Sequence, residues 1–225
     1  ACLWHSSHRN AGCTQARPRR RAVAHRPKFR LRATQWLHLR PRTNANVVAT
    51  VFIGVLALDF SSWLVHLVMH KSRFLWRFHL IHHTDTWIDT TTANRHHPGE
   101  SVIRFVFTTL GVVLVGSPMW LVFLYQTLSV VATQFNHANI ALPKKVDLFL
   151  SYFIVSPDMH KVHHHYLMPY TDSNYGNIFS IWDRLFGTFK VLPREEIVYG
   201  VDTHMHPEEH NELKNLLKIP FQKKK

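Results

Sequence analysis

The sequence predicts an all-α fold: an integral membrane helical bundle with a histidine-rich helical cap on its cytosolic side. Two observations predict it. Long apolar runs at 47–69 and 102–136 are typical of helices that enter or cross a bilayer. Histidines recur at helical spacing near the ends of these runs. We therefore expect a basic arm at 1–45, a membrane-embedded domain at 46–192 and a polar tail at 193–225.

The basic charge of the chain is concentrated in residues 1–45. The whole sequence holds 27 Lys and Arg against 14 Asp and Glu, and eleven of the basic residues but no acid lie in this arm. The rest of the chain is nearly neutral and carries no basic stripe or base-stacking platform, so we expect no nucleic-acid partner. Cys2 and Cys13 also lie in the arm, which excludes a disulfide framework or a thiolate metal site from residues 46–225.

Three interpretations of the arm stay open. Its Arg-rich, acid-poor composition fits a transit-like presequence, a disordered cytosolic arm that touches anionic lipid, or a segment that is not native to the protein. We favour the last for a topological reason. If the histidines face the cytosol, where reductants are available, the one span before them puts the arm outside, against the positive-inside tendency. A missing upstream span removes this conflict, so we expect a truncated or atypical N-terminus.

The first apolar run, VVATVFIGVLALDFSSWLVHLVM at 47–69, has 23 residues. A helix of that length is about 35 Å long, enough to cross a bilayer. Asp59 lies inside the run. Because an acid is costly at that depth, we expect Asp59 to face the protein interior or a polar partner. A further apolar stretch at 146–155 is too short to span, and we expect an interfacial helix there.

The second apolar block, at 102–136, is interrupted by a GSP motif at 116–118. One long kinked helix is an alternative, but glycine and proline together favour a turn between two limbs, at 102–116 and 118–136. The hairpin also returns His137 to the side where the other histidine clusters lie, as a single shared site requires. We therefore expect a membrane hairpin.

Three histidine clusters share one helical geometry. HLVMH spaces its histidines i, i+4, and two HxxHH motifs space theirs i, i+3, i+4, so that each cluster occupies one helix face. The clusters are His66 and His70; His79, His82 and His83; and His160, His163 and His164. His165 falls about 100° from its neighbour on a helix and points elsewhere. The SPD motif at 156–158 is typical of a helix start before the last cluster. Because neutral imidazole suits zinc, copper and iron, the repeated geometry indicates a metal site.

With HxxxH at 66–70 and HxxHH at 79–83 and 160–164 around a membrane hairpin, the chain resembles the fatty acid hydroxylase superfamily, also called the sterol desaturase family. The resemblance runs from about residue 55 to 190. The segments LWRFHLIHHTDTWIDTTTANRHHPGE (75–100) and TDSNYGNIFSIWDRLFGTF (171–189) are similar to bacterial-type sterol desaturase proteins. The resemblance implies an integral membrane oxygenase with a histidine-rich, non-haem di-iron centre.

The resemblance also implies the residues of that centre. The implied metal ligands are His66, His70, His79, His82, His83, His137, His160, His163 and His164. His97 matches a His-Pro position that supports the ligands, and His96 has less support. Four acids close to the histidine boxes could fix ligand rings through their other nitrogen, although each is also an ordinary helix cap or surface acid: Asp85, Asp89, Asp158 and Asp172. Because acids are few and no E-x-x-H motif is present, we expect an imidazole-dominated site.

The implied reaction is the O₂-dependent hydroxylation or desaturation of a lipid (a sterol, fatty acyl or related chain), with two iron ions as cofactor. Zinc outranks ferrous iron at nitrogen sites, so a preparation can carry zinc. The sequence has no GxGxxG or CxxCH motif, and we expect electrons from a separate cytochrome b5- or ferredoxin-type partner.

Two other functions compete with the oxygenase: a histidine-rich membrane metal-binding or transport protein, and an inactive lipid-binding relative. A transporter needs polar residues along its spans, whereas Asp59 and a few hydroxyls are all that lie at depth here. The histidines gather instead near one interface, which favours a reaction site. The intact boxes argue against an inactive relative.

Overall fold

The computed structural model describes residues 44–222. The prediction for the arm at 1–45, with Cys2 and Cys13, lies outside these residues apart from the last two positions of the arm. Within the described range the chain forms helices and loops, and the only β-type pairings there are two isolated bridges, Ile154 with Phe179 and His165 with Tyr199. The all-α prediction is confirmed.

The first apolar run forms helix α1, Asn44–Lys71. In the described part of the chain, α1 from Asn46 onward and α3 (Pro98–Val115) are long and apolar enough to cross a membrane. Large apolar side chains of α1, such as Phe52 and Ile53, are exposed along its first half. Asp59 is fully buried, as predicted.

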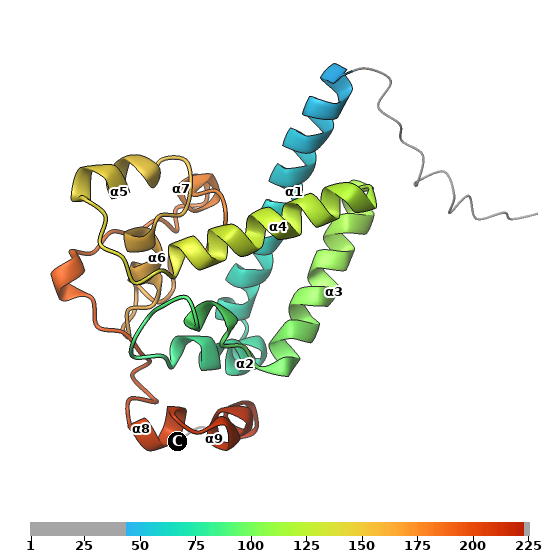
Figure 1. Cartoon of the computed structure of the whole chain (residues 1–225). Helices are drawn as coiled ribbons and strands as arrows, with labels where there is room; N and C mark the ends of the chain where they lie inside the picture. The colour runs from blue at the N-terminus through green and yellow to red at the C-terminus, as the bar shows by residue number, and fades with distance from the viewer. Residues whose placement is uncertain (1–43, 223–225) are drawn as a thin grey trace, which may run out of the picture. The chain divides into compact units, whose positions relative to one another are not determined.

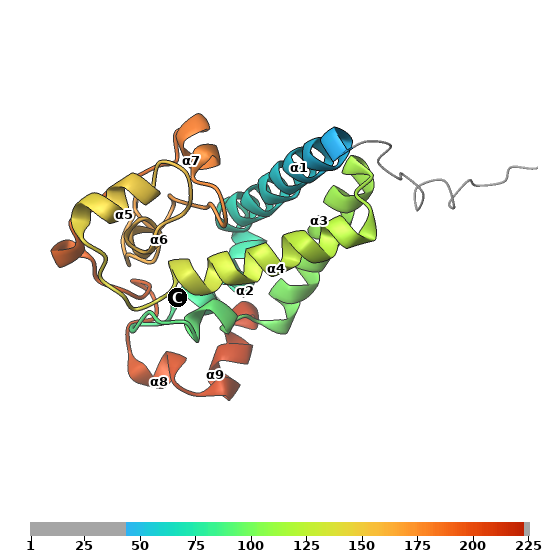
Figure 2. The same cartoon turned by 45° about the horizontal axis from the view of Figure 1, so that its top comes forward.

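The second apolar block forms a hairpin, which confirms the prediction of two limbs. Helix α3 ends at Gly116, whose φ of 68° lies in the left-handed region that favours glycine, and α4, Met119–Asn136, begins directly after Pro118. Figures 1 and 2 both show α3 and α4 meeting at a corner near the start of α1. The open end of the hairpin therefore lies beside the C-terminal half of α1, where the histidines are.

Shorter elements build the cap around this open end (Figure 1). They are α2 (Arg73–His83), η2 (Thr92–Asn94), α5 (Lys144–Leu150), α6 (Pro157–His163), α7 (Ile181–Leu185), η3 (Arg194–Glu196), α8 (Pro207–His210), α9 (Leu213–Lys218) and η4 (Ile219–Phe221). Helix α5 covers part of the stretch 146–155 that was expected to be helical, and its Leu148 and Phe149 side chains are exposed. Its position at a membrane interface stays a prediction.

The tail predicted at 193–225 carries apolar side chains that pack onto α2. Leu216 and Ile219 are buried in one cluster with Leu80, Ile81 and Val201. At roughly 25 cal/mol per Å² of buried apolar surface, such side chains contribute about 1.5–3 kcal/mol each. This packing fixes the outer face of α2 and leaves its other face for the histidines.

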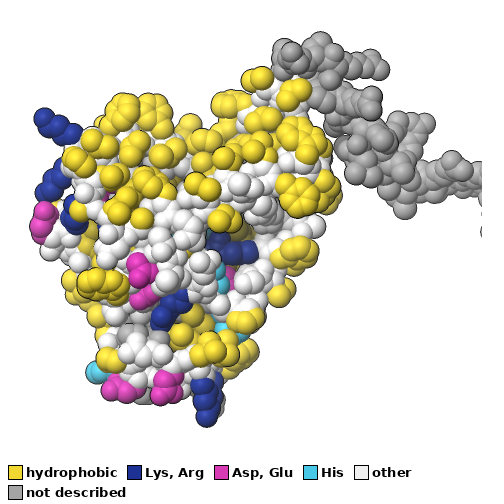
Figure 3. All heavy atoms as spheres, viewed as in Figure 1, with side chains coloured by type: hydrophobic (Ala, Val, Ile, Leu, Met, Phe, Trp, Pro, Cys, Tyr) yellow, Lys and Arg dark blue, Asp and Glu magenta, His cyan; other side chains and the backbone are white. Residues whose placement is uncertain are grey.

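Apolar side chains dominate the surface of the hairpin corner. Figure 3 shows them gathered around the corner and the beginning of α1, with no charged side chain visible there. Val113, Leu114 and Trp120 are among the exposed apolar residues of this region, and Leu114 is 85% exposed. Such a contiguous apolar surface marks a contact with membrane or protein.

Candidate metal centre

The last two turns of α1 and the last two turns of α2 bring two histidine clusters face to face. Ser72 separates the helices and caps α2, because its hydroxyl accepts a hydrogen bond from the Leu75 amide (3.4 Å). His66 and His70 on α1 then lie beside His79, and the Nε2 atoms of His66 and His79 are 3.0 Å apart. The rings of all five histidines on these two helices are buried.

The third cluster lies on α6, which begins as predicted. Ser156 caps the helix by accepting a bond from the Met159 amide, with Pro157 in the first turn. Asp147 of α5 holds this cap: its carboxylate accepts bonds from the Ser156 hydroxyl (2.7 Å) and the Asp158 amide (3.2 Å). The short helix therefore starts at a fixed point and turns its histidines inward.

The hairpin delivers the ninth histidine. His137 follows α4 directly, and its Nε2 lies 3.0 Å from Nε2 of His160 and 3.2 Å from Nε2 of His82. His165 points elsewhere, as predicted: its ring packs against Tyr166 and Tyr170, and its Nδ1 accepts a bond from the Val198 amide.

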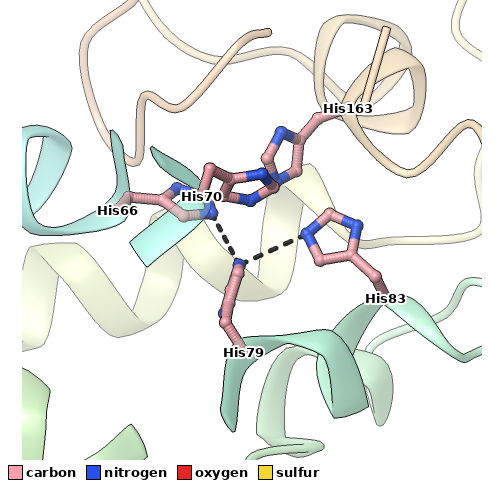
Figure 4. A group of neighbouring side chains, drawn as sticks. All are labelled: His66, His70, His79, His83 and His163. Atoms are coloured by element: carbon pink, nitrogen blue, oxygen red, sulfur yellow. Dashed lines mark hydrogen bonds between the residues drawn. The ribbon is translucent and has the colours of Figure 1, made fainter. Parts of the chain in front are cut away.

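The structure brings together all nine histidines that the sequence assigned to metal, in two neighbouring groups. The ligand atoms within each group lie within 4.8 Å of one another. The first group is His66, His70, His79, His83 and His163, shown in Figure 4, and the second is His82, His137, His160 and His164. All nine side chains are buried.

Six of the nine rings are held at Nδ1 by an acceptor outside the groups. His66 donates to the Tyr175 carbonyl (2.8 Å), His163 to that of Ser173 (2.6 Å), His82 to that of Thr92 (3.1 Å), His137 to that of Thr133 (2.8 Å), His79 to Glu100 (2.8 Å) and His70 to Asp172 (3.2 Å). A ring that donates from Nδ1 in its neutral form carries its lone pair at Nε2. These bonds therefore aim lone pairs into the two groups.

This tautomer pattern creates contacts that no hydrogen bond can satisfy. Nε2 of His66 and Nε2 of His79 are 3.0 Å apart, the contact drawn as a dashed line in Figure 4, yet both carry lone pairs. Nε2 of His82 and Nε2 of His137 repeat the situation at 3.2 Å. A cation between such nitrogens removes the repulsion. The donor set thus fits bound metal ions.

Burial keeps these rings neutral and available for metal. Desolvation lowers the pKa of His137 to about 4 and holds the pKa values of the histidines on α2 and α6 below the usual 6.5. Within the described residues, Nε2 of His70 and of His163 are buried and have no hydrogen-bond partner. Free, neutral imidazole nitrogens are the form that binds zinc, copper or iron.

The two groups differ in the charge behind them. Carboxylates stand behind the first group: Glu100 behind His79 and Asp172 behind His70. Asp172 also accepts a bond from Lys71, and although burial opposes it, these two hydrogen bonds lower the pKa of Asp172. The anchored rings of the second group, by contrast, donate to backbone carbonyls and to the neutral amide oxygen of Asn136 (2.6 Å from His137 Nδ1).

Of the four acids expected to support the histidine rings, one contacts a ring directly and the other three bond to different residues. Asp172 holds His70, as the sequence suggested. Asp85 accepts a bond from the Thr92 hydroxyl and so acts one step away, on the residue whose carbonyl holds His82. Asp158 forms an ion pair with Arg194, and Asp89 caps a local turn through Thr91.

His97 has a different neighbourhood from the expected one. It caps α3 by accepting a bond from the Gly99 amide (2.8 Å), and its ring packs against Phe78 and Phe221. Its neighbour His96 lies closer to the metal groups: the ring stacks on His82, with centroids 4.9 Å apart. The sequence held one signal that His97 caps a helix: a residue before proline favours an extended backbone, as an N-cap requires, and Pro98 follows His97.

Three buried acids escaped the sequence analysis as parts of the site. Glu100 is fully buried behind His79. Asp59 accepts bonds from the amides of Ile178 and Phe179, and Asp183 accepts them from the amides of Tyr175 and Gly176. Asp59 and Asp183 thus dock the segment 175–183, whose Tyr175 carbonyl holds His66. The sequence signal for such buried acids is an acid that lies within or beside an apolar stretch.

A cavity of about 230 Å³ opens beside the metal groups. Four of the nine grouped histidines line it, namely His66, His82, His137 and His160. Its walls come from α1, α3, α4 and the loops at 93–96 and 176–177. A molecule in the cavity can therefore reach both groups of nitrogens, and the second group more fully.

Comparisons with known proteins agree with the histidine pattern. A family model described as fatty acid hydroxylase matches residues 51–188, which is more than half of the chain. Within the described residues, the two candidate spans and the histidine groups fit an all-α, integral membrane member of that family. No solved structure matches significantly.

Several curated proteins are similar over the same part of the chain. The ornithine lipid hydroxylase OlsE of Rhizobium tropici is 26% identical over 64% of this chain and 43% of its own length. The human alkylglycerol monooxygenase is 29% identical over 69% and 33%. The very-long-chain aldehyde decarbonylase GL1-11 of Oryza sativa subsp. indica is 30% identical over 64% and 53%. This chain thus spans about half or less of these relatives, and it belongs to the fatty acid hydroxylase family.

Proposed function

We propose that the protein is a membrane-bound, non-haem di-iron oxidoreductase that uses O₂ to hydroxylate or desaturate a lipid. The observation that carries this proposal is the set of nine buried histidines, divided into groups of five and four with lone pairs aimed inward. Two metal ions account for two groups. A single ion, with at most six ligands, leaves several buried nitrogens unpaired.

The donor set is compatible with iron in this role. Neutral imidazole binds iron, zinc and copper alike, so the choice depends on the chemistry the family performs. Iron bound at such a centre supplies the activation of O₂ and the oxidation of an otherwise inert C–H bond. The described residues offer no thiolate there, and their two carboxylates, Glu100 and Asp172, bind histidine rings instead of entering the groups.

The chain's own residues supply positioning and exclusion of water. Hydrogen bonds at Nδ1 fix the tautomer and the orientation of six rings. Burial of the groups strengthens electrostatic interactions inside the centre. The cavity beside the second group holds the part of the substrate to be oxidised, with His137 and His160 in its lining.

The relatives suggest the chemistry and the substrate class. Their printed names describe hydroxylation, mono-oxygenation and decarbonylation of ornithine lipid, alkylglycerol and aldehyde substrates. We infer that this protein oxidises a lipid and expect a hydroxylated product before a desaturated one. We also infer a cytosol-facing centre and a separate electron donor of the cytochrome b5 or ferredoxin type.

The test is iron content and Mössbauer spectroscopy of the full chain, purified in detergent after growth on ⁵⁷Fe. About two irons per chain, with a ferrous signal that changes on exposure to O₂, supports the proposal. Firmly held zinc that iron cannot replace with any reactivity toward O₂ overturns it. In that case a metal-transport function becomes the leading hypothesis, and metal uptake into proteoliposomes tests it. Protein that binds lipid but no metal indicates an inactive lipid-binding relative.

A further inference from the structure

The cavity beside the metal groups contains a feature that lipid oxidation does not require. Arg104 lies on α3, inside a helix apolar enough to span a membrane, and lines the cavity. It is six residues, about 9 Å, beyond the start of the helix at Pro98. Arg104 therefore adds a charged residue to Asp59 and the hydroxyls that the sequence placed at depth, and the interpretation that these were all is wrong. A guanidinium inside such a helix is costly, and ionisable side chains there mark functional pathways or sites.

Arg104 is anchored on one side only. Its Nε donates to Glu100 Oε1 (2.8 Å), one helical turn earlier. The side chain is 30% exposed, whereas Glu100 is fully buried. The guanidinium carries five N–H groups in a planar fork, and among the described residues one of them has an assigned partner. The remaining donors are available to the cavity.

The rest of the cavity wall has the chemistry of a polar headgroup site. Arg104 is the one formally charged side chain among the described residues that line it, and no Asp or Glu lines it. Hydroxyl and amide side chains also line it: Ser62, Asn94, Ser129, Thr133, Gln134, Asn136 and Asn177. In Figure 3, a basic side chain lies beside histidine and acidic side chains in a hollow near the middle of this face.

The size and position of the cavity fit a headgroup better than an acyl chain. A volume of about 230 Å³ leaves room for a phosphate or carboxylate and a few carbon atoms. Val130 of α4 both lines the cavity and is 59% exposed. The cavity therefore borders the apolar surface, where Phe123 and Val131 can cover a lipid tail.

We infer that this cavity binds the anionic headgroup of a lipid, a phosphate or carboxylate, on Arg104 and thereby presents carbon atoms next to the headgroup to the metal centre. The inference rests on the proposed function. It excludes oxidation deep within an acyl chain as the main reaction, because the tail lies outside the cavity. Bound metal cations, faced by neutral imidazoles, add to the positive potential that attracts the anion.

The test measures binding without turnover. Full-length protein in dodecyl maltoside, loaded with zinc, is titrated with decyl phosphate, decanol and inorganic phosphate, and binding is followed by calorimetry. We expect decyl phosphate to bind at least about tenfold more tightly than either other probe, since charge-assisted bidentate bonds and a tail act together. Inorganic phosphate that binds as tightly as decyl phosphate overturns the lipid assignment.

Three variants and one control variant localise the effect. Arg104→Gln should weaken decyl phosphate binding about tenfold or more, and Arg104→Lys less, because lysine keeps the charge but loses the fork. Gln134→Glu places an acid in the part of the cavity lining that α4 contributes, leaves Glu100 unchanged, and should also weaken the binding of decyl phosphate. Arg73→Gln removes the same charge from an exposed position outside the cavity and should change nothing.

Equal affinity of the wild type, Arg104→Gln and Gln134→Glu for decyl phosphate overturns the inference. Metal analysis of every sample separates this failure from failure of the proposed function. Protein that holds two zinc ions but shows no preference for the anion has a metal centre without a headgroup site, whereas protein that holds no metal contradicts the centre itself.

Discussion

Substitution of Glu100 by glutamine should weaken one metal position and spare the other. Glu100 is fully buried and accepts bonds from His79 Nδ1 and Arg104 Nε, both at 2.8 Å. Glutamine keeps one acceptor oxygen but removes the negative charge that raises the basicity of the ring. Loss of such an outer hydrogen bond typically costs 10–100-fold in metal affinity, which corresponds to about 1.4–2.8 kcal/mol.

The position that should weaken is the group of five histidines. The anchored rings of the other group donate chiefly to the carbonyls of Thr92 and Thr133, which no side-chain substitution removes. Glu100→Gln also leaves Arg104 without its carboxylate. Because the Arg104 side chain is 30% exposed, water shares this cost, and we expect about 1–3 kcal/mol of lost folding stability.

Competition with a chelator measures the two positions separately. Zinc-loaded protein is titrated with a chelator of graded strength, and bound zinc is quantified at each step, with the unfolding temperature recorded in parallel. Glu195→Gln serves as the control, because that glutamate is 65% exposed and pairs with Lys144 on the surface. If Glu100→Gln shifts both release steps equally, or shifts neither, the assignment of Glu100 to one group is wrong.

Three further predictions use the same site. His164→Ala should lower metal content in metal analysis, whereas His165→Ala, the adjacent residue facing away, should leave it unchanged. Asp183→Asn should lower the unfolding temperature, since it disrupts buried bonds worth about 1.5–3 kcal/mol each to a charged acceptor, and Asp202→Asn on the surface should not. The metal-free protein should lose stability as the pH falls below about 6.5. The buried histidines of α2 and α6 have lowered pKa values, so they stay neutral in the folded state but take up protons in the unfolded state. The free energy of unfolding should therefore fall by up to about 1.4 kcal/mol per histidine and pH unit. Chemical denaturation between pH 5 and 8 measures this slope, and a flat profile contradicts the neutral rings.

The sequence predicted the elements of the site because their signals are local. HxxxH and HxxHH are readable as helix faces, and the SPD motif at 156–158 marks the start of α6 as observed. Glycine and proline at 116–118 marked the hairpin, whose left-handed Gly116 the structure contains. The requirement that His137 return to the other clusters was also a correct guide, since its ring contacts His82 and His160.

The partners of the histidine rings were harder to predict because most of them are backbone carbonyls or acids far away in the sequence. Asp172 follows His70 by about a hundred positions, and the Tyr175 carbonyl that holds His66 has no side-chain signal at all. Proximity in sequence favoured Asp85 and Asp158 instead, which bind Thr92 and Arg194. Long-range pairing depends on how the cap packs on α1, which no local motif encodes.

The segment 173–188 links the fold of the cap to the histidine groups. Two buried acids, Asp59 and Asp183, bind its amides, and its own carbonyls at Ser173 and Tyr175 orient His163 and His66. The match to the family model ends at residue 188, and the amides of Thr188 and Phe189 both donate to the Asp183 carbonyl. Metal binding should stabilise the docked state, since the rings it requires are oriented only there, and release of metal should loosen the cap before it unfolds the spans.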